Sequence, residues 1–194
     1  MKLSPTDRAW FDKVLRAVAA AEAGPSEADL AQAPVLSDWK AAISPGLHVM
    51  LWGEVTDHPL LGTASITTSQ LIAIDAEAGW ARTASRWYRL GRPLDALEAE
   101  VVKSLTEKNT EADTVRFTLP GFMNIDDPAL LARLLTQYIM NVREIDAADR
   151  AASGREARNA LVHRRSPLFT RQYHSLLRPP LPCLLYTSDA ADEE

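Results

Sequence analysis

Hydrophobic positions follow two different spacings along this chain, and the changes between them predict where helices and strands lie. Ser4 and Pro5 are typical of a helix start, and the helix is expected to end at Gly24-Pro25. Between them, apolar residues at spacings of one, three and four predict one apolar helix face: Trp10, Phe11, Val14, Leu15 and Val18. A capping-box pattern at 26–29 predicts a short second helix that ends at Pro34. Residues 37–44 predict one brief helical turn.

The middle of the chain has an extended pattern instead. Segments 47–55, 64–74 and 80–90 are rich in β-branched and aromatic residues and are separated by turn-forming residues. They predict a three-stranded antiparallel meander over 47–90. A hairpin loop is expected at 75–79, between the second and third strands.

Helical spacing returns after the predicted sheet. It predicts a helix over 94–108, and residues 114–119 have the composition of a further strand. The longest helix is predicted over 128–152, where two aspartates and a proline precede a broad apolar stripe. We therefore predict an α+β fold, in which a small antiparallel β-meander is flanked by N-terminal helices and the long C-terminal helix packs on the sheet.

Length and composition favour one globular domain, predicted over 1–154. The chain has 194 residues, of which 46% are hydrophobic and 24% are charged, which suffices for an ordinary core. No apolar run approaches the roughly 20 residues that cross a bilayer, and the first residues lead straight into an amphipathic pattern. We therefore expect a cytoplasmic protein without a membrane partner. The formal net charge of −5 argues against a protein built mainly to hold nucleic acid.

The end of the chain differs in character from the rest. Residues 155–182 are basic and rich in proline, and two interpretations stay open: an arm for a nucleic acid or protein partner, or an out-of-frame translation. Residues 183–193 resemble the translation of a transposase-type sequencing adapter, so 183–194 is predicted to be an artefact of metagenomic reads. Cys183 would then not be native, and the natural carboxyl terminus would lie elsewhere, leaving a fragment.

The densest group of aromatic and basic side chains lies between Gly79 and Gly91. Read as one strand, this stretch has aromatic and guanidinium groups in alternation on one face, which could stack on bases and neutralise phosphates. That face would consist of Trp80, Arg82, Ala84, Arg86, Tyr88 and Leu90. The alternative is that the aromatic residues fill a core while the arginines pair with the acidic body. The predicted binding residues are Trp80, Arg82, Arg86, Tyr88 and Arg89. The first hypothesis is thus a non-enzymatic binding module that contacts protein or nucleic acid.

Two further functions stay open. A small hydrolase or transferase would use Asp57 and His58 with the hydroxyl groups of 67–69. A structural homo-oligomer would instead show an exposed apolar stripe on 128–152. The sequence carries no common nucleotide-binding, nucleophile or metalloprotease motif, and its four histidines are scattered, so we predict no catalytic residues, no metal and no cofactor. Asp126 and Asp127 are interpreted as a helix cap.

A family resemblance rests on a set of motifs in the middle of the chain. These are Trp52-Gly53-Glu54-Val55, His58-Pro59, Gly62, Ile66-Thr67-Thr68-Ser69, Asp75 and Gly79-Trp80-Ala81-Arg82-Thr83-Ala84-Ser85-Arg86-Trp87-Tyr88-Arg89-Leu90-Gly91, with Ala33-Pro34-Val35-Leu36-Ser37-Asp38-Trp39 upstream. Together they resemble a family of short bacterial proteins with a domain of unknown function, over residues 26–93. The resemblance implies a cytoplasmic bacterial protein, and no activity, cofactor or site residue comes with it.

Overall fold

The structure is a computed structural model that describes residues 3–107 and 114–164, with side chains described up to Arg155. The chain divides into a unit of residues 1–155, to which all contacts below belong, and a unit of residues 156–194. The segment 183–194, predicted to be an artefact, and most of the predicted basic tail lie outside the described residues.

Both N-terminal helices are confirmed. Helix α1 (Pro5–Ala23) begins after Ser4, whose hydroxyl oxygen accepts a hydrogen bond from the backbone N–H of Asp7 (3.2 Å). Helix α2 (Glu27–Gln32) begins with a reciprocal capping box between Ser26 and Asp29. These caps use only neighbouring residues, which is why local sequence predicted them.

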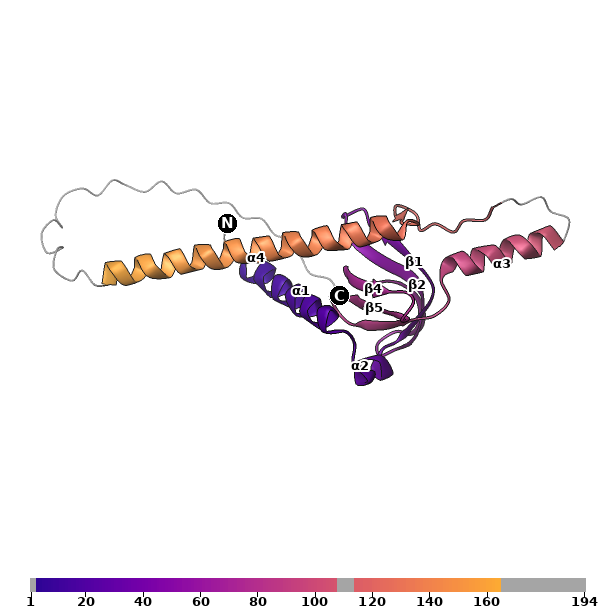
Figure 1. Cartoon of the computed structure of the whole chain (residues 1–194), viewed down its shortest axis with the longest axis horizontal. Helices are drawn as coiled ribbons and strands as arrows, with labels where there is room; N and C mark the ends of the chain where they lie inside the picture. Colours follow the sequence, from indigo (N-terminus) through magenta and orange to yellow (C-terminus); the bar gives the residue numbers. More distant parts are fainter. Residues whose placement is uncertain (1–2, 108–113, 165–194) are drawn as a thin grey trace, which may run out of the picture. The chain divides into compact units, whose positions relative to one another are not determined.

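Seven strands of the described residues form one mixed sheet (Figure 1). They are β1 (Val35–Ile43), β2 (Val49–His58), β3 (Gly62–Thr67), β4 (Leu71–Asp75), β5 (Trp80–Thr83), β6 (Trp87–Leu90) and β7 (Met123–Asn124). Their order is β3-β2-β1-β6-β5-β4, and β7 pairs with β1. Strands β1 and β6 are parallel, whereas the other neighbours are antiparallel.

The sheet curls, because its two edge strands are almost consecutive in sequence. Strands β3 and β4 are joined only by residues 68–70. Six strands in a flat sheet would hold the edges about 24 Å apart at about 4.8 Å per strand, whereas four residue steps reach at most about 14 Å. Thr68 forms hydrogen bonds with Leu51 of β2, next to one edge, and Gln70 O accepts from Ala84 N (2.8 Å) near the other. Figure 1 shows this curvature of the strands.

Three local predictions are wrong. Residues 37–44 do not form a helical turn, because most of this segment is β1, which pairs with β2 along its length. The predicted strand 64–74 is interrupted at 68–70, where the chain passes between the edges. The predicted strand 80–90 is a hairpin of β5 and β6, whose turn is held by Thr83 Oγ1 as it accepts from the backbone N–H of Arg86 (3.2 Å).

The later elements agree better with their pattern. Helix α3 (Leu94–Glu107) is confirmed, but residues 114–119 form no strand, and the two-residue β7 lies a few residues later. Helix α4 (Pro128–Arg164) begins where predicted and is longer than expected. Asp127 caps it through Oδ1, which accepts from the backbone N–H of Ala129 (2.8 Å).

The core lies between the sheet and the first half of α4, as the α+β prediction required. Leu131 and Leu135 of α4 pack against a buried cluster that includes Leu51 and Val55 of β2. Further along, Val142 of α4 joins a second cluster. That cluster also contains Val14, Ala17 and Val18 of α1, Ile72 of β4 and Ala84. Each fully buried aliphatic side chain contributes about 1.5–3 kcal/mol, so these contacts hold both helices on the sheet.

Candidate functional site

The parallel pair in the middle of the sheet is very short, and this opens a wedge. Strands β1 and β6 pair only at Val35 with Arg89 and at Leu36 with Leu90. Residues of β1, β4 and α4 line a cavity of about 630 Å³. We call this the wedge cavity. Its lining is Trp39, Lys40, Ala41, Ile72, Ala73, Ile74, Ala76, Pro93, Asp95, Ile125, Asp126, Pro128, Leu131, Ala132, Leu135, Thr136 and Ile139.

A bulge in β1 starts the wedge. The register between β1 and β2 shifts between Ser37 and Lys40, and Asp38 has a positive φ of 49°. Ser37 approaches two glycines so closely that a Cβ on Gly53 would lie 2.7 Å from its backbone oxygen, and one on Gly91 would lie 2.4 Å from its Oγ. These two glycines of the family-like motif therefore have a packing role against the bulge of β1.

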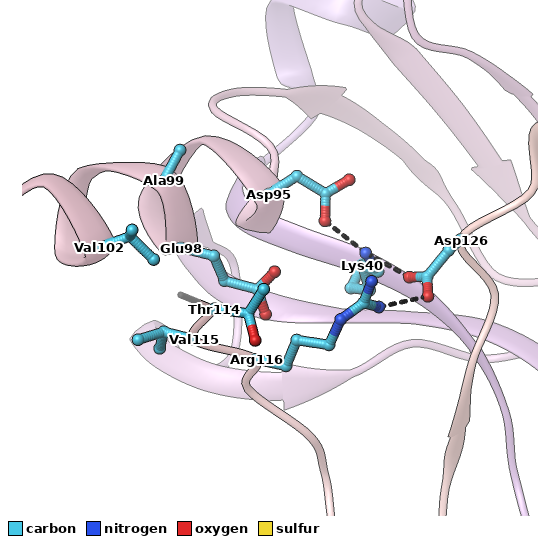
Figure 2. Close-up of a pocket in the computed structure, with 9 residues that line it drawn as sticks. All are labelled: Lys40, Asp95, Glu98, Ala99, Val102, Thr114, Val115, Arg116 and Asp126. Carbon is cyan, nitrogen blue, oxygen red and sulfur yellow. Dashed lines mark hydrogen bonds and ion pairs between the residues drawn. The ribbon is translucent and has the colours of Figure 1, made fainter. Parts of the chain in front are cut away.

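Lys40 stands at one end of the wedge cavity and is the buried charge of the site. Its residue surface is 6% exposed, and Nζ forms ion pairs with Asp95, in the first turn of α3, and with Asp126 Oδ1 (2.6 Å), just before α4. Asp126 Oδ2 also accepts from Arg116 Nη1 (2.6 Å). Figure 2 shows Lys40 between the two carboxylates, with Arg116 beside Asp126. We call these residues the Lys40 cluster.

The charge state of Lys40 follows from this geometry. Burial opposes its positive charge, but the hydrogen bonds to Asp126 and Asp95 outweigh burial and raise the pKa of Lys40. The hydrogen bonds from Lys40 and Arg116 in turn lower the pKa of Asp126. Lys40 is therefore protonated at neutral pH, which suits it to donate hydrogen bonds and not to act as an amine nucleophile.

A second, smaller cavity of about 290 Å³ adjoins the Lys40 cluster on the side of α3. It shares Lys40, Asp95 and Asp126 with the wedge cavity, and Figure 2 shows its remaining lining. These are Glu98, Ala99, Val102, Thr114, Val115 and Arg116. The Lys40 cluster thus forms part of the wall of both cavities.

The hairpin separates the residues that were predicted to share one face. Trp80 lies opposite Arg89 and Arg82 lies opposite Trp87, so these four share a face, while Tyr88 points to the other one. The predicted alternation of Trp80, Arg82, Arg86 and Tyr88 on one face is therefore wrong, because the chain turns back after Thr83.

The four hairpin residues that do share a face contact one another or nearby backbone. The indoles of Trp80 and Trp87 meet edge to face at 5.4 Å, and the Arg82 guanidinium lies 5.3 Å from the Trp87 ring. Burial lowers the pKa of Arg82. Arg89 Nε donates to the carbonyl of Ala33 (3.1 Å). Partner binding by the five predicted residues stays a prediction.

Arg86 and Tyr88 meet the residues of the enzymatic alternative. A third cavity, of about 330 Å³, is lined by His58, Leu61, Ile66, Thr67, Thr68, Ser69, Ser85, Arg86 and Tyr88. Tyr88 is 4% exposed and burial raises its pKa. Asp57 is exposed and is not among the lining residues. The structure thus brings two of the predicted binding residues, Arg86 and Tyr88, to the same cavity as His58 and residues 67–69 of the enzymatic alternative.

His58 is held as a hydrogen-bond donor in this cavity. Its Nδ1 accepts from the backbone N–H groups of Leu60 (3.3 Å) and Leu61 (3.1 Å). Burial, and then the charge of Arg86, lower the pKa of His58, so the ring is neutral at pH 7 and its proton lies on Nε2. A general base at Nε2, which the enzymatic alternative needs, requires the opposite tautomer.

Sequence reasoning missed the Lys40 cluster. The one local indication was a lysine inside the apolar run of 39–43, which we misread as part of a helical turn. Asp95 and Asp126 are 55 and 86 positions away in the chain (95 − 40 and 126 − 40), so no local spacing links them to Lys40.

The described residues contain neither a candidate metal centre nor a candidate membrane-spanning helix. No group of three or more His, Cys, Asp or Glu side chains in the described part of the chain is placed to hold a metal ion. None of the helices described here has a stretch long and apolar enough to cross a bilayer.

Comparison with known proteins identifies the family. A family model described as a family of unknown function, DUF6634, matches residues 1–157, so the chain belongs to this family. This confirms the resemblance noted over 26–93, and the match extends well beyond that segment. No curated protein and no solved structure matches the chain.

Proposed function

We propose that this member of the DUF6634 family is a non-enzymatic binding module that holds a small, mostly apolar molecule in the wedge cavity. The observation that carries the proposal is a cavity of about 630 Å³ whose lining is apolar except for Lys40, Asp95, Asp126 and Thr136. Ligand sites are commonly cavities of about 300–1,000 Å³ with apolar walls and a few convergent polar groups.

Packing energetics support an occupant. An apolar molecule that binds in a cavity gains dispersion contacts with the apolar side chains that line it. Leu131 and Leu135 of α4 and Ile74 of β4 all face the wedge cavity. An apolar ligand would give these side chains new contacts without moving the backbone.

The Lys40 cluster indicates which polar group the ligand carries. An ammonium group has three N–H donors, and the ion pairs with Asp95 and Asp126 use two of them. The third can donate to a carbonyl or hydroxyl oxygen of a ligand in the wedge cavity. We therefore expect a neutral ligand with an apolar body and an oxygen acceptor at one end. The cluster attracts no anionic head group, because the charges of Lys40 and Arg116 are balanced by those of Asp95 and Asp126.

The experiment uses a probe and one matched pair of variants. The neutral dye N-phenyl-1-naphthylamine, whose fluorescence rises in apolar surroundings, is titrated with the full chain. Ala132→Trp places an indole at an exposed position of α4 that lines the wedge cavity, whereas Arg133→Trp places the same group one position further along the helix, outside the lining. Both positions are exposed, so both variants are expected to fold.

We expect saturable dye binding by the wild type and by Arg133→Trp with similar affinity. Ala132→Trp should bind at least about tenfold more weakly, because its indole occupies the volume that the dye needs. Equal affinities of the two tryptophan variants, or fluorescence that never saturates, would rule out the wedge cavity as the site.

We also propose that the protein lies in the cytoplasm of a bacterium. The resemblance of residues 26–93 to short bacterial proteins supports this setting. Fractionation of a bacterium that expresses the gene natively should recover the protein with the cytosol, and its recovery with membranes or periplasm would contradict the setting.

A further inference from the structure

The third cavity, beside His58, has a shape that depends on a second bulge. The pairing of β2 with β3 shifts between Val55 and His58, and Asp57 in the bulge has a positive φ of 60°. In a regular strand Val55 and His58 would point to opposite faces, yet both are buried here. The bulge thus turns the imidazole inward, where it lines the cavity together with Arg86 and Ser69.

Several side chains in this cavity can donate hydrogen bonds, and one of them has no partner. Ser69 Oγ is shielded from solvent and makes no hydrogen bond with any described residue. His58 offers Nε2–H, as its Nδ1 is already occupied by backbone donors. Arg86 adds a guanidinium, and Ser85 Oγ is 3.1 Å from Lys13 Nζ, which brings a second cation near the cavity.

Neighbouring Thr68 shows what a purely structural hydroxyl looks like here. Its Oγ1 accepts from the backbone N–H of Leu51 (3.0 Å) and donates to the carbonyl of Ser69 (3.0 Å). Both capacities of Thr68 are therefore used within the fold. The Ser69 hydroxyl has no such role, and a buried polar group without a partner costs free energy unless something completes it.

We infer that this cavity binds the phosphate group of a small phosphate monoester. The lining contains a guanidinium, a neutral imidazole donor and several hydroxyls, and no carboxylate is among its members. Guanidinium groups and hydroxyl donors match the oxygens of a phosphate. The volume of about 330 Å³ leaves room for a small substituent next to the phosphate. This ligand differs in chemistry and position from the apolar molecule of the wedge cavity.

The test compares three ligands and three variants of the full chain. Inorganic phosphate, O-phosphoserine and sulfate are titrated by calorimetry, and the shift of the melting temperature is recorded with each. Ser69→Ala and Arg86→Gln each remove one inferred donor. Arg133→Gln, on an exposed position of α4 outside the cavity, removes the same charge as Arg86→Gln and serves as the control.

The expected result is saturable binding of O-phosphoserine, weakened at least about tenfold by Arg86→Gln and left unchanged by Arg133→Gln. Ser69→Ala should melt at or above the temperature of the wild type without ligand, because it loses no hydrogen bond, yet show a smaller ligand-induced shift. Tighter binding of O-phosphoserine than of inorganic phosphate supports a monoester ligand. Tighter binding of inorganic phosphate would show that the ligand is not a monoester.

Three outcomes would overturn the site as a whole. They are no saturable binding of any of the three ligands, equal weakening by Arg86→Gln and Arg133→Gln, and an unchanged ligand-induced shift in Ser69→Ala. If Arg86→Gln does not fold, Ser69→Ala decides the question alone, because its loss of the hydroxyl removes no hydrogen bond among the described residues.

Discussion

Lys40 Nζ lies 2.6 Å from Asp126 Oδ1, and the two side chains differ greatly in their access to water. The Lys40 side chain is 7% exposed, whereas the Asp126 and Asp95 side chains are 48% and 66% exposed. Removing the lysine and removing its carboxylate partners should therefore have different effects on stability. A carboxylate left behind can be rehydrated, whereas an ammonium left behind stays buried.

The first prediction concerns that inequality. Lys40→Met is expected to change the free energy of unfolding by no more than about 1 kcal/mol, because an apolar chain of similar length fills the same space. Asp95→Asn combined with Asp126→Asn is expected to cost about 3 kcal/mol, because it leaves Lys40 buried without a counter-charge. Urea denaturation at pH 7, with equal m values, measures both. A larger loss in Lys40→Met than in the double variant would contradict the prediction.

The second prediction concerns the two glycines beside the bulge of β1. Gly53→Ala and Gly91→Ala should each destabilise the fold by about 1–3 kcal/mol through overpacking. The added Cβ meets backbone at Gly53 (Ser37 O, 2.7 Å) but mainly a hydroxyl at Gly91 (Ser37 Oγ, 2.4 Å). Ser37→Ala should therefore partly rescue Gly91→Ala and fail to rescue Gly53→Ala.

A double-mutant cycle from thermal or urea unfolding separates these two cases. Coupling between positions 37 and 91, together with additivity between positions 37 and 53, is the expected pattern. Equal coupling energies in both cycles would mean that the close approach is not what requires glycine at these positions.

The third prediction concerns acid stability. Arg8 of α1 forms ion pairs with Asp12 and with two aspartates of α4, Asp146 (2.6 Å) and Asp149 (3.3 Å). The hydrogen bond from Arg8 lowers the pKa of Asp12, and the backbone N–H of Leu3 followed by Arg8 lowers that of Asp149. Burial opposes the charge of Asp146, but Arg8 and Arg150 outweigh burial and lower its pKa too.

The direction in which stability changes with pH follows from the linkage between protonation and folding. Each aspartate has a lower pKa in the folded chain than the value of about 3.9 in an unfolded one, so the stabilisation is complete above about pH 4 and is lost as the pH falls through the folded values. The melting temperature should therefore fall steeply below about pH 4, and Arg8→Gln should flatten this dependence. An equally steep fall in Arg8→Gln would show that the α1–α4 ion pairs do not cause it.

The fourth prediction separates structural from binding roles in the hairpin. Arg82→Ala should lower the melting temperature, because the guanidinium covers the Trp87 ring and lies in the field of Asp29. Titration of an unstructured oligonucleotide at two salt concentrations then tests the partner hypothesis. Lost binding in a variant of unchanged stability would favour the partner hypothesis, and lost stability with unchanged binding would favour the structural role.

Local sequence was sufficient to predict the elements that neighbouring residues stabilise. The helix starts at Ser4, Ser26 and Asp127 were predictable, because each cap uses residues within three positions of one another. The apolar stripe of α4 was predictable for the same reason, since its periodicity requires no knowledge of the partner surface. The α+β class followed from those patterns, whereas the family motif contained Gly53 and Gly91 without indicating a role for them.

Only the tertiary structure decided the sheet and both candidate sites. Residues 37–44 have the composition of a turn, yet pairing with β2 makes most of them a strand, because strand identity depends on a partner distant in sequence. The hairpin turn after Thr83 is set by a side chain that accepts backbone N–H groups, and it reverses which residues share a face. The Lys40 cluster joins residues 40, 95 and 126, and the cavity beside His58 joins residues 58, 69 and 86. Such juxtapositions follow from the curl of the sheet and its short parallel pair, which no periodicity along a single segment can specify.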